Sequence, residues 1–287
     1  MSLRANLFAT ACLLGLTTSA QAAPAIWEVR DNDSAIWLFG SIHVLPEATA
    51  WRTPLFDAIL ADADMVVFET DISPATMAEL GGRAFVQGTY MDGTLLTDVI
   101  DDKTERQLRQ YAESVALQMG PLLAMRPWLV TSTISTAAMA TTGYTAQGVE
   151  FVLDQELARE RLRYLETGDE QLAVLSGGSE QEQVALLQAT LADMAKLPKL
   201  MGKMLRSWMN GSPEVLAELI AMESGGIEGA FMERLIYTRN RNWIAPLEQM
   251  LGDNEANLIV VGAGHLAGDG SVLDLLEQAG YEIERLQ

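Results

Sequence analysis

Residues 258–281 read Leu258-Ile-Val-Val-Gly-Ala-Gly-His-Leu-Ala-Gly-Asp-Gly-Ser-Val-Leu-Asp-Leu-Leu-Glu-Gln-Ala-Gly-Tyr281. The apolar run at the start predicts a short buried strand, and the glycines that follow predict a turn carrying His265. The apolar residues after that turn predict a helix. A strand that ends in a glycine-rich turn and continues into a helix is typical of a βαβ unit in an α/β fold.

The same order of elements occurs near the start of the chain, in residues 35–69. An apolar strand is followed by the turn Gly40-Ser-Ile-His43, a helix opening at Thr53-Pro54, and a second apolar strand at 65–68. In both copies a histidine stands three residues after a glycine, and the chain has no other histidines. The repeat therefore predicts an α/β fold built from two βαβ-type units.

The region between the two units, residues 73–250 approximately, is predicted to be a large helical insertion. Helix starts and glycine punctuation recur through it, with one short strand expected at 162–165. That strand ends in Glu166-Thr167, just as the strand of the first unit ends in Glu69-Thr70. A β-hairpin before His43 and a last strand at 282–286 complete the expected elements.

The first 22 residues have the pattern of a secretory signal peptide. Arg4 precedes an apolar run from Ala5 to Leu16, and Ala20-Gln-Ala22 matches a cleavage site. The run is too short to cross a bilayer, which needs about 20 residues, and no later segment is longer. We expect residues 23–287 to form a single domain that is periplasmic or secreted and has no membrane span.

Charge and cysteine content exclude several classes of function. The formal net charge is −20, so the chain should repel nucleic acid and anionic membrane surfaces. Cys12 is the one cysteine and lies in the predicted signal peptide, which leaves the mature chain without disulfides or thiolate chemistry. The glycines around His265 match neither a Walker loop nor a Gly-x-Gly-x-x-Gly motif. Nucleotide binding is therefore not expected.

Four side chains stand where predicted strands end: His43, His265, Glu69 and Glu166. Because ligands of α/β sheets bind at the carboxyl ends of strands, we expect them to converge. A lone histidine is more often structural, but a matched pair in two copies of one unit favours function. The four could hold a divalent metal with an open position for water. They could also act without metal, with a histidine as general base and a glutamate orienting it.

The sequence resembles a known family, the TraB/PrgY/GumN group that includes the Tiki proteins, and is closest to its bacterial GumN-like branch. The resemblance covers nearly all of the predicted mature chain and rests on the order and spacing of short motifs. These are Gly40-Ser-Ile-His43, Phe68-Glu69, Arg126-Pro-Trp128, Gly148 with Glu150, Leu165-Glu-Thr167, Arg239-Asn240 followed by Trp243, and the glycine-rich turn around His265.

The resemblance implies a fold and an activity. The implied fold is a central mixed β-sheet surrounded by helices, similar to the erythromycin-esterase and ChaN-like proteins. The implied activity is that of a metal-dependent hydrolase centred on the paired Gly-x-x-His motifs and a glutamate. Members similar to Tiki act as metalloproteases, and bacterial members are linked to pheromone shutdown or exopolysaccharide clusters. Glu150 departs from the family pattern, in which an aspartate is usual.

We therefore expect a metal-dependent hydrolase acting on a peptide or a related amide or ester. The expected metal ligands are His43, Glu69 and His265. Manganese or cobalt suits such a nitrogen- and oxygen-rich site, and zinc is compatible with it.

Three further residues receive expected roles. Glu166 is expected as a fourth ligand or as the general base. Asn240 and Arg239 are chosen on the resemblance alone, Asn240 as a polar group near the substrate and Arg239 as a contact for an anion or oxyanion.

Two other classes of function fit the same residues. The first is a metal-free esterase in which one histidine is the base, as the likeness to erythromycin esterase implies. The second is a haem- or iron-binding protein, because two histidines suit axial ligation and the ChaN-like relatives imply iron capture.

Overall fold

The computed structural model describes residues 22–222 and 227–287. The predicted signal peptide lies outside these ranges except for Ala22. Within them, no helix has both the length and the apolar character that a membrane crossing requires.

A mixed six-stranded sheet forms the centre of the described fold, in the order β6-β4-β7-β2-β1-β8. The strands β6, β4, β7 and β2 run parallel to one another, and β1 is antiparallel to both of its neighbours. The sheet confirms the predicted α/β class. Its strands are β1 (Ile26–Arg30), β2 (Ala35–Ser41), β4 (Met65–Phe68), β6 (Leu162–Tyr164), β7 (Asn257–Gly262) and β8 (Glu282–Arg285).

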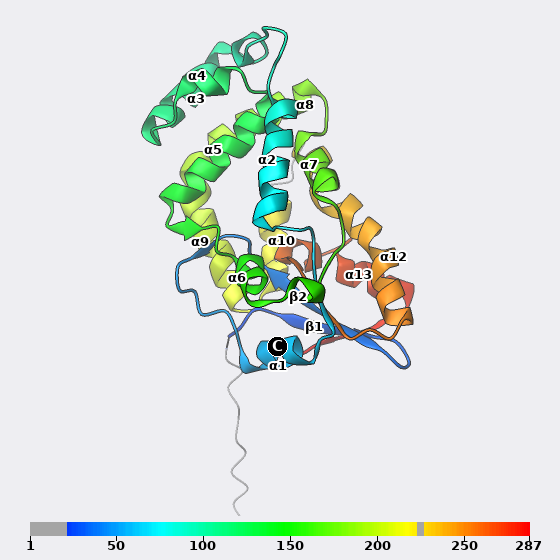
Figure 1. Ribbon diagram of the computed structural model, residues 1–287. Coiled ribbons are helices and arrows are strands. Elements are labelled where there is room, and N and C mark those ends of the chain that lie inside the picture. The colour runs from blue at the N-terminus through cyan, green and yellow to red at the C-terminus, as the bar shows by residue number, and fades with distance from the viewer. Residues whose placement is uncertain (1–21, 223–226) are drawn as a thin grey trace, which may run out of the picture.

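Helices cover the sheet and extend away from it to one side (Figure 1). Their starts follow local sequence signals: the side chain of Thr53, for example, accepts a hydrogen bond from the backbone N–H of Phe56 at the start of α1. The helices are α1 (Pro54–Asp62), α2 (Pro74–Gly88), α3 (Asp102–Ser114), α4 (Met119–Leu123), α5 (Pro127–Thr141), α6 (Val149–Glu156), α7 (Gly168–Ser176), α8 (Glu180–Asp193), α9 (Leu197–Met209), α10 (Pro213–Met222), α11 (Ile227–Met232), α12 (Thr238–Gly252) and α13 (Val272–Ala279).

The two strand–turn–helix–strand units interlock in the sheet. The connection from β2 through α1 to β4 passes over β7, whereas the connection from β7 through α13 to β8 passes over β2 and β1. Crossovers between parallel strands are right-handed in nearly all proteins, so connections in opposite directions place their helices on opposite faces. Accordingly, Phe56 of α1 shares a hydrophobic core with Phe39, and Leu276 of α13 shares another with Leu38.

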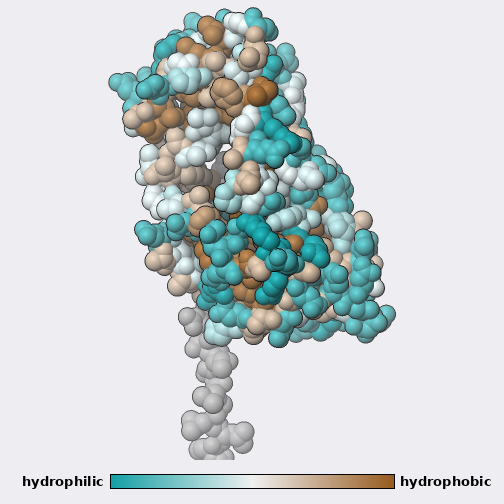
Figure 2. All heavy atoms as spheres, in the orientation of Figure 1, coloured by the Kyte–Doolittle hydropathy of each residue, from teal (hydrophilic) through white to brown (hydrophobic). Residues whose placement is uncertain are grey.

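The helical insertion has a hydrophobic core of its own. Leu108 of α3, Ile134 of α5 and Leu187 of α8 are buried together away from the sheet. On the face in Figure 2, hydrophobic patches lie over the helices at the top, and the lower right is mainly hydrophilic. Two short strands that the sequence analysis missed, β3 (Leu45–Pro46) and β5 (Tyr144–Thr145), pair and join the insertion to the loop after His43.

Substitution of Phe39 tests the aromatic core beneath β2. Its ring is fully buried and packs against Trp51, Phe56 and Trp208. Phe39→Ala should lower the free energy of unfolding by about 3–5 kcal/mol, because it removes buried surface and leaves a cavity. The measurement is denaturant unfolding. Phe85→Ala, at a 59% exposed position, is the matched control and should change stability by less than about 0.5 kcal/mol. Equal losses in both variants would contradict the assignment of this core.

Candidate functional site

His265 lies at the carboxyl end of β7, in the short helix η5 (Ala263–Leu266), and is 3% exposed. Its Nδ1 is 2.6 Å from Oδ1 of Asn240, whose amide nitrogen donates to the carbonyl of Gly270 at 2.8 Å. Because a carbonyl only accepts, this bond fixes the orientation of the Asn240 amide. Nδ1 of His265 therefore carries the proton, and Nε2 presents its lone pair.

Glu69 directly follows β4 and is buried. One carboxylate oxygen, Oε1, accepts the backbone N–H of Gly262 at 2.7 Å, and the other, Oε2, accepts Nη2 of Arg239 at 2.5 Å. Nε2 of His265 is 3.7 Å from Oε1. The carboxylate thus joins the ends of β4 and β7 to helix α12.

Arg239 of α12 bridges the two glutamates predicted at strand ends. Its Nη2 is 2.6 Å from Oε1 of Glu166, its Nε is 3.0 Å from Oε2 of the same carboxylate, and it binds Glu69 as well. Its Nη1 is 3.0 Å from Nε2 of His265, and the guanidinium stacks on Trp243 at 4.8 Å from the ring centroid. The buried cation therefore balances two carboxylates and also donates to the neutral histidine.

His43 approaches the same place from the loop after β2. Its side chain is 60% exposed, its Nδ1 is 3.0 Å from Oε1 of Glu150, and its Nε2 is 4.0 Å from Oε1 of Glu69. Glu150 lies in the first turn of α6 and also accepts a hydrogen bond from the hydroxyl of Ser41. A Cβ at Gly148 would lie 2.2 Å from the His43 carbonyl oxygen. Only glycine therefore lets α6 begin this close to the histidine.

The three candidate ligands face one space in front of Gly262. A Cβ at that position would lie 3.2 Å from Oε1 of Glu69, 3.4 Å from Nε2 of His43 and 3.6 Å from Cδ2 of His265. The missing side chain of Gly262 leaves this space open, and we call it the Gly262 cradle.

Burial and charge shift the pKa values of the two histidines in opposite directions. The carboxylate of Glu150 raises the pKa of His43 to about 10, against the effect of burial, and His43 remains accessible to water. Burial lowers the pKa of His265 to about 3, and the nearby charge of Glu69 offsets only part of this effect. At neutral pH His43 is therefore protonated and His265 is neutral.

The pKa values of the glutamates also diverge. Burial raises the pKa of Glu69, but opposing effects overcome it and lower this pKa to about 2: the charge that His265 gains at such low pH, the charges of His43 and Arg239, and the N–H of Gly262. Burial also raises the pKa of Glu166, and there the bonds to Arg239 do not offset the whole effect. Two carboxyl groups of one cluster are thus held at different proton affinities.

All six residues chosen from the sequence lie in or beside this cluster. Asn240 has a different role from the expected substrate contact: it is 0% exposed, and both ends of its amide are hydrogen-bonded, so it positions His265. Glu150, which pairs with His43, and Ser41, which donates to Glu150, are not among those six residues. The available signal for Glu150 was its place with Gly148 among the motifs of the family resemblance.

The arrangement does not close around a metal as it stands. In residues 22–222 and 227–287, no group of three or more His, Cys, Asp or Glu side chains is placed to hold an ion. Two features account for this: Arg239 takes the lone pair of His265, and the separations of 3.7 and 4.0 Å from Glu69 exceed the roughly 3.4 Å between ligand atoms of a tetrahedral site.

Comparisons with known proteins identify relatives. The TraB/PrgY/gumN family model matches residues 25–285. An uncharacterized protein of Treponema pallidum (strain Nichols) is 22% identical over 275 residues, which cover 88% of this chain and 80% of that protein. No solved structure matches.

Two shorter matches carry a named activity. The "Metalloprotease TIKI homolog" of Amphimedon queenslandica is 31% identical over 80 residues, or 26% of this chain and 16% of that protein. "Metalloprotease TIKI2" of Danio rerio is 38% identical over 60 residues, or 20% of this chain and 12% of that protein. This chain therefore aligns with only a small part of each of these two proteins.

The two histidines allow a direct test by NMR of metal-free protein, because the chain has no others. At pH 7 the His43 ring should be an imidazolium, and at pH 5 the His265 ring should still be the neutral form with its proton on Nδ1. The measurement is a pH titration of the ring ¹⁵N and ¹³C shifts. In urea-unfolded protein, the control, both should titrate near pH 6.5, roughly the unperturbed value. Two ordinary titrations near that pH in folded protein would contradict the described site.

Proposed function

We propose that this chain, which belongs to the TraB/PrgY/gumN family, is a divalent-metal-dependent hydrolase of a peptide or a related amide or ester bond. The observation that carries the proposal is the convergence of His43, Glu69 and His265 on the Gly262 cradle. The similarity to two proteins named as TIKI metalloproteases supports the same reaction class.

The donor atoms at the cradle are of the types that a divalent ion binds, and His43 would release its proton on binding the ion. Oε1 of Glu69 is committed to one backbone N–H and keeps a second lone pair, and the tautomer of His265 directs its Nε2 toward Glu69. Nε2 of His265 would become free to bind a metal if Nη1 of Arg239 moved away from it. The guanidinium would stay in the site, because Nη2 is still bound by the carboxylates of Glu69 and Glu166. Imidazole and carboxylate ligands favour manganese or cobalt and permit zinc.

The residues of the candidate site each have a part in the proposed reaction. A bound divalent ion would polarise a carbonyl and lower the pKa of a bound water. Glu150 orients the His43 ring through Nδ1, as Asn240 orients the ring of His265. Glu166, whose pKa is raised by burial, is the proposed general base. Arg239 holds Glu166 and Glu69 in place and supplies a fixed positive charge for a developing oxyanion.

One observation favours a second candidate, metal-free hydrolysis. The pair of His43 and Glu150 is a histidine with a carboxylate behind Nδ1 and an accessible Nε2. In the same site Arg239 already supplies a cation beside Glu69. A histidine oriented in this way transfers protons in acyl-group hydrolysis. This candidate uses the exposed histidine directly and leaves His265 as a buried neutral group.

The two candidates are separated by metal content and by variants of both histidines. His43→Ala and His265→Ala should each lower activity on a peptide library by about 100-fold or more and remove most of the bound metal, and the double variant should be scarcely worse. Gly262→Ala should have the same effect because its methyl group enters the cradle. The measurements are turnover, elemental analysis of chelator-free protein, and a melting curve for each variant.

Two control variants accompany these measurements. Glu47→Gln changes an exposed residue of the His43 loop, and Gly252→Ala changes a glycine whose added Cβ would meet nothing within 4 Å. Both should retain activity and metal. The shared site would be refuted by a well-folded double histidine variant that keeps its metal and in which the free-energy costs of the two single substitutions on activity add. Activity that survives chelation but is lost in His43→Ala would select the metal-free candidate.

A further inference from the structure

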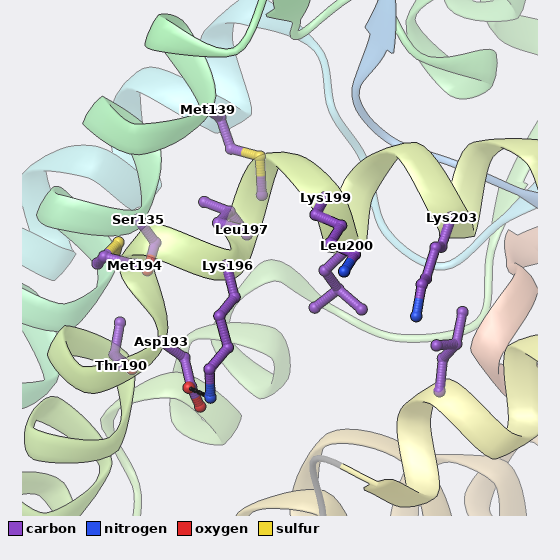
Figure 3. A pocket seen from close by; sticks show the side chains of 11 residues that line it. Ser135, Met139, Thr190, Asp193, Met194, Lys196, Leu197, Lys199, Leu200 and Lys203 are labelled. Atoms are coloured by element: carbon purple, nitrogen blue, oxygen red, sulfur yellow. Dashed lines mark hydrogen bonds and ion pairs between the residues drawn. The ribbon is translucent and has the colours of Figure 1, made fainter.

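A second cavity lies in the helical part of the structure, away from the Gly262 cradle. Its volume is about 550 Å³, within the range of roughly 300–1,000 Å³ typical of small-molecule sites. Side chains from α5, from the end of α8, from α9 and from α10 line it (Figure 3), and none of the site residues described above is among them. Most of the wall is apolar, formed by residues such as Met139, Leu197, Leu200 and Leu219.

Cationic side chains stand at this apolar cavity. Lys199 and Lys203 are one turn apart on α9, and Figure 3 shows their ammonium groups on the side of α9 that faces α10. Neither lysine forms an ion pair with any residue that the structure describes. Lys196 lies farther along the wall and pairs with Asp193. The cavity thus offers two ammonium groups to an incoming anion.

The charge of α9 contrasts with that of the whole chain. Residues 194–213 contain four basic residues and no acidic residue, although the formal net charge of the chain is −20. A local cluster of cations in an acidic protein creates a site of positive potential, which attracts anions. Charge and shape together therefore select an occupant that has an anionic group and an apolar body.

We propose that this cavity binds a long-chain fatty acid, with its carboxylate between Lys199 and Lys203 and its hydrocarbon chain along the apolar wall. Burial of the chain in the cavity removes apolar surface from water. A lysine ammonium is a compact point charge that suits a small carboxylate. A peptide is a poorer fit, because the uncharged polar side chains of the wall within the described residues are Ser135 and Thr190, and these two cannot satisfy a peptide backbone.

The proposed ligand site is independent of the hydrolytic chemistry. The opposite side of α9 carries Trp208, whose Nε1 donates to the carbonyl of Gly40 at 2.6 Å in the strand that leads to His43. The helix therefore separates the cavity from the sheet. Fatty-acid binding can be measured directly, whether or not the chain proves to be a hydrolase.

The experiment is a calorimetric titration of delipidated full-length mature protein with oleate below its micelle concentration. Oleate should bind with 1:1 stoichiometry, and the double variant K199E/K203E should bind it at least about tenfold more weakly, because two attractive charges become repulsive. Lys103→Glu, at an exposed lysine of α3, is the matched control and should leave the affinity unchanged. Oleyl alcohol, which has the same chain without the charge, should bind at least about tenfold more weakly to the unaltered protein.

A second variant tests the apolar wall. Leu200→Trp adds volume inside the cavity and should weaken the binding of both oleate and oleyl alcohol. Melting curves are recorded for every variant, and Leu200→Trp decides the outcome if K199E/K203E does not fold. Any of three results would overturn the proposal. The first is equal affinity for oleate and oleyl alcohol, and the second is an oleate affinity unaltered by K199E/K203E or by a folded Leu200→Trp. The third is preferential binding of a glutamate-rich peptide.

Discussion

The buried carboxylate of Glu69 is the group around which the candidate site is built. A charge removed from water must be compensated by hydrogen bonds and by opposite charge. Glu69 receives both, from the backbone N–H of Gly262 and from the guanidinium of Arg239. Arg239 in turn fixes Glu166 and donates to His265. A change at Glu69 would therefore disturb every other member of this network.

The order of strands brings the network together. β7 lies between β4 and β2, and β6 lies on the other side of β4. Because these four strands are parallel, their carboxyl ends lie at one edge of the sheet. Glu69, Glu166, His43 and His265 all follow those ends. The interlocking of the two βαβ-type units is what makes their strands neighbours, so the sheet topology determines the composition of the site.

Part of this arrangement was predictable from the sequence. The repeated Gly-x-x-His pattern predicted two related units, and apolar runs ending in Glu69 and Glu166 predicted strand ends that could meet. Arg239 and Asn240 carry no periodic signal, because a polar residue on a helix has the same local pattern whether it faces solvent or a buried carboxylate. They were chosen through family resemblance. The tautomer of His265 and the place of Glu150 behind His43 depend on contacts between residues far apart in sequence, which local patterns do not encode.

Glu69 and Arg239 form one buried, energetically coupled pair, and a double-mutant cycle measures this coupling. Glu69→Gln, Arg239→Met and the double variant are compared by urea unfolding at pH 7 in the presence of a chelator. Arg239→Met should cost about 3–5 kcal/mol, because it leaves the buried carboxylates of Glu69 and Glu166 without their cation. Glu69→Gln should cost less, because Arg239 keeps its ion pair with Glu166. The double change should cost less than the sum of the two, with a coupling energy above about 1 kcal/mol. Single-variant costs near zero, or costs that add within about 0.5 kcal/mol, would show that the two side chains are not coupled.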